Sequence, residues 1–427
     1  MNTIYKAKIL SPISKDEISF FSPGYLVNSE NGRILELTDE NPQKKYKNSQ
    51  FLDFSDKIIC PGFIDVHSHL SQFQLMGIFH EKLLNWLERL VFPQEEKFQS
   101  EKYAKLAADI FFENLLSNGT TTSCTYVTVH KNATDLAFQS ANEKGIRAFI
   151  GKVLVDQNVP KNWLENPEKS LKDSEGLIKK WDGIDGRLKF VLTPRHAVSC
   201  SFDFLKKIGK LAKKYDAFVQ SHLSESKIEI KKIKKIFPNF KNYTDIYLKA
   251  EILSEKTIMA HCIHLSENEI KILRKTNTKI SHCPTSNRFL ESGIMPYRKL
   301  EESDLTIGLG TDIAGGYSTS MFNEMREAIE TSKMMNIIHP EKKYRRISVF
   351  EAFYLATLGG AKVLSLENEI GSLEKNKSAD FLIINLDKIS GNNEEILSNP
   401  KNILSKMIYL GNENIVEQVF VKGKRLI

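Results

Sequence analysis

The chain has 427 residues, of which 41% are hydrophobic and 26% charged, with 22 Gly and 13 Pro. These values exclude collagen-like, low-complexity and wholly disordered proteins, and they indicate two or three domains or one large barrel with an appendage. A chain of this size buries a large core without disulfides or structural metals, so any metal is expected to serve chemistry. No apolar run reaches the length of about 18 residues that a membrane span requires.

The net charge of +7 is not expected to reflect a nucleic-acid partner. The densest basic stretch, 227–242, places Ile230, Ile233 and Ile236 three residues apart, which predicts an amphipathic helix with solvated lysines. No nucleic-acid module signature accompanies it. The five cysteines occur singly, and the amino terminus alternates like a strand and lacks a signal-peptide core. We therefore expect a cytoplasmic protein with no membrane partner.

Short β-branched or apolar runs alternate with segments of helical spacing, such as 102–118, 202–215 and 349–364. The runs are 58–66, 120–128, 146–155, 188–194, 217–221, 257–260, 278–281 and 305–310. Strands that alternate with helices in this way predict a parallel α/β barrel of the (β/α)8 type.

Reactive side chains stand at the ends of most of these runs. They are His67, His69, Arg195, His196, His222, His261, His282 and Asp312. Barrel enzymes build their active sites at the carboxyl ends of the strands. We therefore expect these side chains to meet at one mouth of the barrel despite their wide separation in sequence.

A metal site is the chemistry that these residue types favour. His67 and His69 are two residues apart on an extended segment, so both imidazoles point to the same side. Taken alone, the pair is weak evidence for a metal and is more typical of histidines that pack in a core or face solvent. With His222 and Asp312 it becomes three nitrogens and one carboxylate, a set suited to zinc or another transition metal. Asp312 has an alternative role as a cap of the turn that follows it.

Glu225 follows His222 by three residues, so we expect it beside the ion without binding it. Desolvation in a closed pocket raises the pKa of a carboxyl group until it exchanges protons near neutral pH. The alternative is a capping role at a helix N-terminus after Ser224.

Nine segments, in order along nearly the whole chain, closely resemble the guanine deaminase family of the amidohydrolase superfamily. They are PGFIDVHSHLSQF, LLNWLERLVFP, NGTTT, TPRHAVSCS, QSHLSES, MAHC, SHCPTSN, GLGTDIAGGYS and ATLGGAKVL. The HxH and GTD patterns are shared by the superfamily. The SQF, LLNWL…FP and TPR patterns are typical of guanine deaminases in particular.

The resemblance implies a distorted (β/α)8 barrel over 61–366 and a small β-sandwich domain built from both chain ends, 1–60 and 367–427. It also implies a homodimer. Asn376 stands where relatives usually carry Gly. Because Asn tolerates the left-handed backbone conformation of a turn, we expect little consequence.

For the site, the resemblance implies one zinc ion held by His67, His69, His222 and Asp312. It further implies that Glu225 and Asp312 pass protons and that His261 hydrogen-bonds the nucleophile or the tetrahedral intermediate. Two-metal relatives carry a lysine where this chain has Arg195, so one ion is expected. His282 and Cys283 receive no metal role and are expected to pack in the barrel. His80, His130, His264 and His339 receive no role.

The resemblance implies hydrolysis of guanine to xanthine and ammonia. Arg195 is suited to the purine carbonyl, and the Gln72 amide can both donate and accept. Alternatively, Arg195 forms a structural ion pair and Gln72 is a surface residue. The family favours Phe where this chain has His196, whose imidazole can still stack on the base but adds a polar edge.

Two other hypotheses therefore remain open: a deaminase of oxidised guanine, a pterin or an amino-triazine, and an inactive scaffold of the same fold. The scaffold is disfavoured because every expected ligand and Glu225 are present. The HxE and PCxxC signature of base-flipping deaminases is absent.

Overall fold

The computed structural model describes residues 1–79, 83–342, 344–390 and 393–427. The chain divides into two compact units. One comprises residues 1–65, 113–122 and 319–427, and the other comprises residues 66–112 and 123–318. The expected domain division at 60/61 and 366/367 stays a prediction. Within the described residues, no helix has both the length and the hydropathy needed to cross a membrane.

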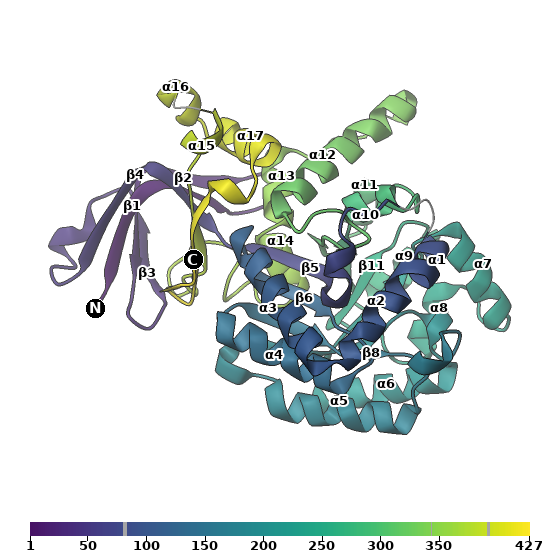
Figure 1. Ribbon diagram of the computed structural model, residues 1–427. Helices are drawn as coiled ribbons and strands as arrows, with labels where there is room; N and C mark the ends of the chain where they lie inside the picture. The colour runs from purple at the N-terminus through teal and green to yellow at the C-terminus, as the bar shows by residue number, and fades with distance from the viewer. Residues whose placement is uncertain (80–82, 343, 391–392) are drawn as a thin grey trace. The chain divides into compact units, whose positions relative to one another are not determined.

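Parallel strands form the predicted barrel, which is confirmed (Figure 1). The strands are β5 (Phe63–His69), β6 (Thr120–Tyr126), β7 (Arg147–Gly151), β8 (Val153–Leu154), β9 (Leu188–Pro194), β10 (Phe218–Leu223), β11 (Thr257–His261), β12 (Lys279–His282) and β13 (Ile307–Leu309). Their order is β13-β12-β11-β10-β9-β7-β6-β5, and β8 pairs with β9. Because β8 continues β7 after one residue, the two count as one strand of the barrel, which therefore has eight strands.

Backbone hydrogen bonds join the first barrel strand to the segment that follows the last one. The Asp312 amide donates to the His67 carbonyl at 2.8 Å, and the His69 amide donates to the Ile313 carbonyl at 2.9 Å. Every residue of β5 is buried. Burial on both faces is expected for a strand that lies between the barrel interior and a layer of helices.

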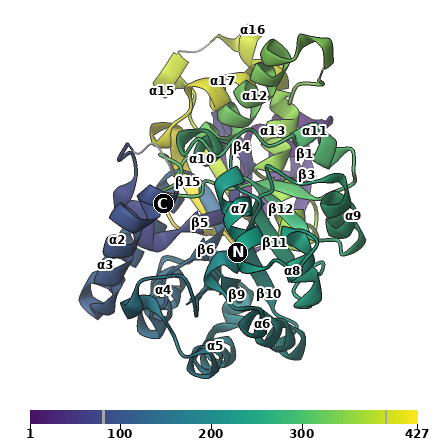
Figure 2. The same ribbon diagram turned by 90° about the vertical axis from the view of Figure 1, so that its right-hand side faces the viewer.

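Helices surround the barrel strands (Figures 1 and 2). They include α3 (Glu101–Ser117), α4 (Lys131–Lys144), α5 (Pro167–Trp181), α6 (Phe202–Tyr215), α7 (Lys227–Ile236), α8 (Tyr243–Lys249) and α9 (Glu267–Lys275). The helices predicted at 102–118 and 202–215 are thus confirmed. In α6, the Ser201 hydroxyl accepts from the Phe204 amide at 3.2 Å, and Asp216 ends the helix with a left-handed backbone.

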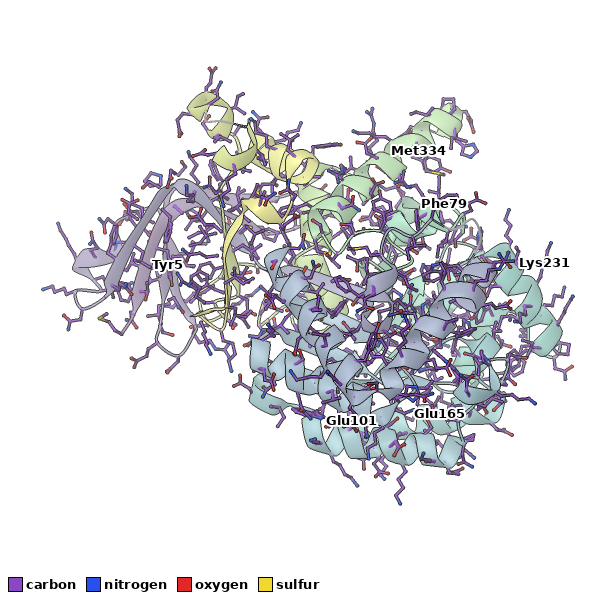
Figure 3. All side chains as sticks on the ribbon, viewed as in Figure 1. Tyr5, Phe79, Glu101, Glu165, Lys231 and Met334 are labelled. Atoms are coloured by element: carbon purple, nitrogen blue, oxygen red, sulfur yellow. The ribbon has the colours of Figure 1, made fainter. Side chains whose placement is uncertain are left out.

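The basic stretch forms α7, whose apolar face is the expected one. Ile233 is buried, whereas Lys231, Lys234 and Lys235 are exposed. Figure 3 shows Lys231 on the outside of this helix. The interpretation of the lysines as a solvated helix face is confirmed.

The helix predicted over 349–364 is two helices, α13 (Val349–Leu355) and α14 (Leu358–Val363). The single-helix prediction was wrong because the helical conformation is interrupted at Thr357, next to a backbone group that bonds to a barrel strand. The Ala356 carbonyl accepts from the Ile64 amide at 2.8 Å. The Thr357 hydroxyl donates to the Phe353 carbonyl at 2.6 Å, and its backbone is non-helical.

Strands from both chain ends form one further sheet, which confirms that both ends contribute to it; the sandwich arrangement stays a prediction. They are β1 (Thr3–Pro12), β2 (Ile18–Asn28), β3 (Ile34–Thr38), β4 (Gln50–Pro61), β14 (Phe381–Ile384), β15 (Val416–Val421) and β16 (Lys424–Arg425), in the order β16-β15-β14-β4-β1-β2-β3. Tyr5, labelled in Figure 3, packs edge-on against Phe381 and Phe420. Asn376 has a φ of +73°, so the left-handed turn expected there is confirmed.

The first predicted run, 58–66, spans two strands. Residues 58–61 belong to β4 and pair with β14, whereas the barrel strand begins at Phe63. Gly62 lies between the two strands, where a Cβ atom would stand 2.1 Å from the Thr121 hydroxyl oxygen. The sequence shows one apolar run because the buried ends of both strands carry the same residue types.

Candidate metal and substrate site

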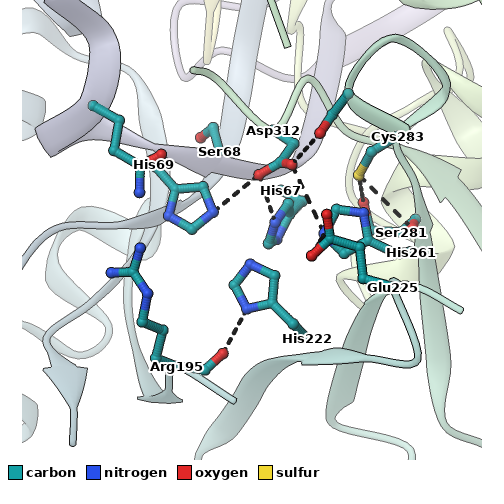
Figure 4. A network of polar contacts seen from close by, with 12 residues as sticks. His67, Ser68, His69, Arg195, His222, Glu225, His261, Ser281, Cys283 and Asp312 are labelled. Atoms are coloured by element: carbon teal, nitrogen blue, oxygen red, sulfur yellow. Dashed lines mark hydrogen bonds and ion pairs between the residues drawn. The ribbon is translucent and has the colours of Figure 1, made fainter. Parts of the chain in front are cut away.

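Five side chains from four barrel strands meet at the carboxyl ends of those strands (Figure 4). We call them the metal cluster: His67 and His69 on β5, His222 on β10, His261 on β11, and Asp312 just after β13. One carboxylate oxygen, Oδ1 of Asp312, lies 3.1 Å from His67 Nε2 and 3.0 Å from His69 Nε2. The backbone bonds that join β5 to the segment after β13 therefore also bring these side chains together.

The cluster has the dimensions of a metal site. One potential ligand atom from each of His67, His222, His261 and Asp312 lies within 4.8 Å of the others, and all four residues are buried. His69 shares the same Asp312 oxygen. The expected ligands are thus brought together. His261, expected as a hydrogen-bonding residue, lies among them, and the choice of ligands stays a prediction.

Hydrogen bonds behind the imidazoles suit them to an ion. His222 Nδ1 donates to the Arg195 carbonyl at 2.5 Å, and His261 Nδ1 donates to the Asn287 side-chain oxygen at 2.9 Å. Each bond leaves Nε2 as the atom that faces the cluster. Within the described residues, the buried His261 Nε2 has no hydrogen-bond partner. A buried nitrogen in this state fits a site that receives a further group.

Burial keeps the imidazoles of the three expected ligands, His67, His69 and His222, neutral, as metal ligation requires. It lowers the pKa of His69 to about 3 and that of His222 well below its usual value. Burial acts in the opposite sense on Asp312, but hydrogen bonds from His67 and His69 outweigh it and hold the Asp312 pKa well below its usual value. These three imidazoles are therefore uncharged and Asp312 is ionised at neutral pH. His261 differs, because burial would lower its pKa but the charges of Glu225 and Asp312 outweigh burial and raise it.

Glu225 lies beside the metal cluster on the segment that follows β10. Its Oε2 is 3.7 Å from His261 Nε2, and its Oε1 accepts from the Ser292 hydroxyl at 3.0 Å. Burial raises its pKa to about 7, although the charge of His261 opposes that rise. The helix that follows is capped by Ser226. Glu225 is thus free of the alternative capping role, and its carboxyl can gain or lose a proton near neutrality.

A cavity opens onto the cluster from the same side of the barrel. Its lining includes His69, Gln72, Trp86, Phe92, Asn158, Arg195, His196, His222, Glu225, His261, Leu290 and Asp312. All three residues expected to contact a purine, Gln72, Arg195 and His196, are therefore brought to one cavity. Gln72 is only 1% exposed, so the alternative of a surface residue is wrong.

Two aromatic rings and one carboxylate contact the Arg195 side chain. Its guanidinium lies 5.8 Å from the Phe92 ring centroid and 5.7 Å from that of Trp163. Arg195 Nη1 donates to Glu95 Oε1 at 3.0 Å. The alternative of an ion pair is thus realised, and the same arginine still lines the cavity. We call Gln72, Phe92, Glu95, Trp163 and Arg195 the recognition wall.

His196 has a defined tautomer. Its Nδ1 accepts from the Ser199 amide at 3.2 Å and lies 2.8 Å from the Ser199 hydroxyl. Burial lowers the His196 pKa to about 3, so the ring is neutral and carries its proton on Nε2. The cavity therefore gains a weakly polar aromatic edge at this position.

His282 and Cys283 pack in the barrel as expected. His282 stacks on Tyr297 with ring centroids 6.0 Å apart, and the Cys283 thiol lies 3.4 Å from the Ser281 hydroxyl. Figure 4 shows Cys283 and Ser281 to one side of the cluster. His80 lies outside the described residues.

Several residues of the site carried no assignment in the sequence. They are Glu95, Glu229, Ser286, Asn287 and Ser292. Ser286 and Asn287 belong to α10 (Pro284–Phe289), within the segment SHCPTSN, whose resemblance to the family was the available signal. None of the five lies on a predicted strand, so a search of strand ends could not find them.

Comparisons with known proteins agree with this geometry. The model of the amidohydrolase family matches residues 58–426. The guanine deaminase of Rattus norvegicus is 35% identical over 417 residues, which cover 93% of this chain and 91% of the relative. The guanine deaminase of Escherichia coli is 35% identical over 378 residues, which cover 87% and 83%. The crystal structure of a C. acetobutylicum guanine deaminase, with guanine in its active site, superposes with a TM-score of 0.93 at 35% identity over 100% of both chains.

Proposed function

The chain belongs to the amidohydrolase family, and we propose that it hydrolyses guanine to xanthine and ammonia. The observation that carries this proposal is the single cavity in which Arg195 and Gln72 lie beside the metal cluster. The similarity to a solved guanine deaminase that holds guanine in its active site supports the choice of base.

We propose that one zinc ion is held by His67, His69, His222 and Asp312. Three neutral imidazoles and one carboxylate are a ligand set that zinc prefers. Arg195 directly follows β9, where two-metal relatives carry a lysine, and its guanidinium hydrogen-bonds Glu95. This supports one ion instead of two. When bound, the ion supplies Lewis acidity, which makes hydroxide available near neutral pH.

Glu225 moves the protons in this proposal. With a pKa of about 7, its carboxylate accepts a proton from the attacking water, and its acid form returns that proton to the leaving amino nitrogen. The Ser292 hydroxyl donates to Glu225 Oε1, so the other carboxyl oxygen, Oε2, faces His261. His261 Nε2 and the Asp312 carboxylate face the same point. There His261 would hydrogen-bond the oxygen that attacks the ring carbon, and Asp312 would share with Glu225 in passing protons.

The recognition wall and His196 would hold the base. Arg195 would donate to the purine carbonyl, Gln72 would bind another polar edge, and His196 would stack on the ring. A buried polar group that loses its partner weakens binding, so bases without these edges are disfavoured. The protonated Nε2 of His196 favours a second candidate, a purine or pterin with an additional oxygen acceptor.

Initial rates on a substrate panel test the proposal. The panel holds guanine, 8-oxoguanine, a pterin and an amino-triazine at equal concentration. We expect guanine to be among the fastest substrates. Slow turnover of guanine together with fast turnover of another compound would identify that compound as the substrate. If no member of the panel is converted, the inactive scaffold is favoured.

We also propose a cytoplasmic homodimer. The five cysteines are buried, and within the described residues none of them forms a disulfide, in keeping with a reducing compartment. Size-exclusion chromatography with light scattering measures the oligomeric state, and a monomeric mass at working concentration would contradict the dimer.

A further inference from the structure

Glu95 is a buried carboxylate that touches both expected recognition side chains. It lies near the end of the short helix α2 (Phe92–Glu96) and is 0% exposed. Its Oε1 accepts from Gln72 Nε2 at 3.0 Å and from Arg195 Nη1 at 3.0 Å. One oxygen therefore links the segment after β5 to the segment after β9.

This shared oxygen decides which way the Gln72 amide faces. A carboxylate accepts hydrogen bonds and cannot donate them, so the Gln72 NH2 group must lie toward Glu95. The amide oxygen lies on the other arm and is turned away from Glu95. Because Gln72 lines the cavity, that oxygen is the part of the amide that can accept from a ligand.

The same contact limits the motion of Arg195. Phe92 and Trp163, whose rings lie next to each other, contact the guanidinium, and Glu95 accepts a hydrogen bond from it. A guanidinium carries five N–H donors, so the bond to Glu95 leaves others for the cavity. Without Glu95, a long arginine side chain regains its rotamer freedom and loses its fixed direction.

We infer that Glu95 is a positioning residue that presents an acceptor from Gln72 and donors from Arg195 to the substrate in one fixed arrangement. This inference rests on the proposed function, since it assigns the arrangement to recognition of a base with a carbonyl acceptor and a ring N–H donor. Glu95 lies behind the two side chains and acts through them. Its effect should therefore fall on substrate choice and KM more than on the chemical step.

The test compares guanine with 2-aminopurine, which lacks the carbonyl oxygen. The variants are Glu95→Ala and the conservative Glu95→Gln. Glu269→Ala is the matched control, because Glu269 is a buried carboxylate that accepts from Thr244 and Ser266 and does not line the cavity. For each protein we would measure KM and kcat for guanine, the inhibition constant of 2-aminopurine, zinc content and the thermal midpoint.

For Glu95→Ala, we expect the KM for guanine to rise roughly 10- to 100-fold, with a smaller change in kcat, because a buried hydrogen-bonded charge is lost from behind the binding groups. The inhibition constant of 2-aminopurine should rise less, so the preference for guanine falls. Zinc content should stay at that of the parent protein. Glu95→Gln keeps an oxygen in place, so its KM for guanine should lie between the values of the parent protein and of Glu95→Ala. Glu269→Ala should lower the thermal midpoint and leave the preference for guanine unchanged.

The inference is overturned if Glu95→Ala retains the parent's preference for guanine, whether KM stays the same or rises equally for both compounds. If Glu95→Ala fails to fold, Glu95→Gln decides, and an unchanged preference in that variant overturns the inference. A parent protein that does not convert guanine contradicts the proposed function itself. A parent that converts guanine while its Glu95 variants keep their preference contradicts only the role of Glu95.

Discussion

Residues of the metal cluster and of the recognition wall line one cavity, but the two groups are built differently. The four histidines of the cluster stand on barrel strands, and Asp312 lies three residues after β13, where its amide bonds to the His67 carbonyl. The wall is assembled from η2 (Leu70–Leu75), α2, η5 (Lys161–Trp163) and the segment after β9. Its geometry depends on side-chain contacts such as those of Glu95. The fold thus supplies the chemistry directly, and recognition depends on a small set of buried contacts.

Removal of one cluster residue should have the largest effect. For His67→Ala we expect loss of both zinc and guanine turnover, because one ligand and one contact of Asp312 disappear together. Elemental analysis and the turnover assay check this. His339→Ala, at a partly exposed histidine outside the cavity, is the matched control and should keep both. Stoichiometric zinc in active His67→Ala protein would remove this residue from the site.

Glu225→Gln should separate metal binding from proton transfer. The amide fits the space of the carboxyl but cannot exchange a proton, so we expect normal zinc content and a fall in kcat of about 10² to 10⁴. Turnover close to that of the parent protein would refute the role of Glu225. This variant sharpens the distinction between holding the ion and moving the proton.

Arg195→Met should disrupt the recognition wall and leave the metal cluster intact. The change leaves the buried Glu95 charge without its ion-pair partner, so we expect the free energy of unfolding to fall by about 3–5 kcal/mol. We also expect the KM for guanine to rise. Adding Glu95→Leu should recover stability without recovering KM. Chemical denaturation and steady-state kinetics measure both. A double variant no more stable than Arg195→Met would contradict the buried ion pair.

Ser292→Ala should give the smallest effect, on the pH profile. The Ser292 hydrogen bond holds the Glu225 pKa lower than burial alone would. Activity that requires the Glu225 carboxylate is present above its pKa of about 7 and falls as pH drops through it. Loss of the bond raises that pKa, so the acidic limb of kcat/KM should move to higher pH. A limb that moves to lower pH would contradict this contact.

The sequence predicted the barrel and the cluster because both follow a repeated pattern. Alternation of strands and helices fixed the places of His222 and Asp312, and period-two geometry paired His67 with His69. The break between α13 and α14 was missed because it depends on a bond from Ile64, which is distant in sequence. Glu95 was missed for a similar reason, since its partners lie 23 and 100 residues away. Contacts of this kind leave no periodic signal.

The central claim is that these buried side chains hold one catalytic zinc ion that supports guanine hydrolysis. Its most direct test is the conversion of guanine by purified protein, followed by absorbance, together with elemental analysis before chelation, after chelation and after zinc is restored. The account predicts close to one zinc per chain, loss of conversion on chelation and recovery with zinc. Full conversion of guanine by protein that contains no metal would contradict it.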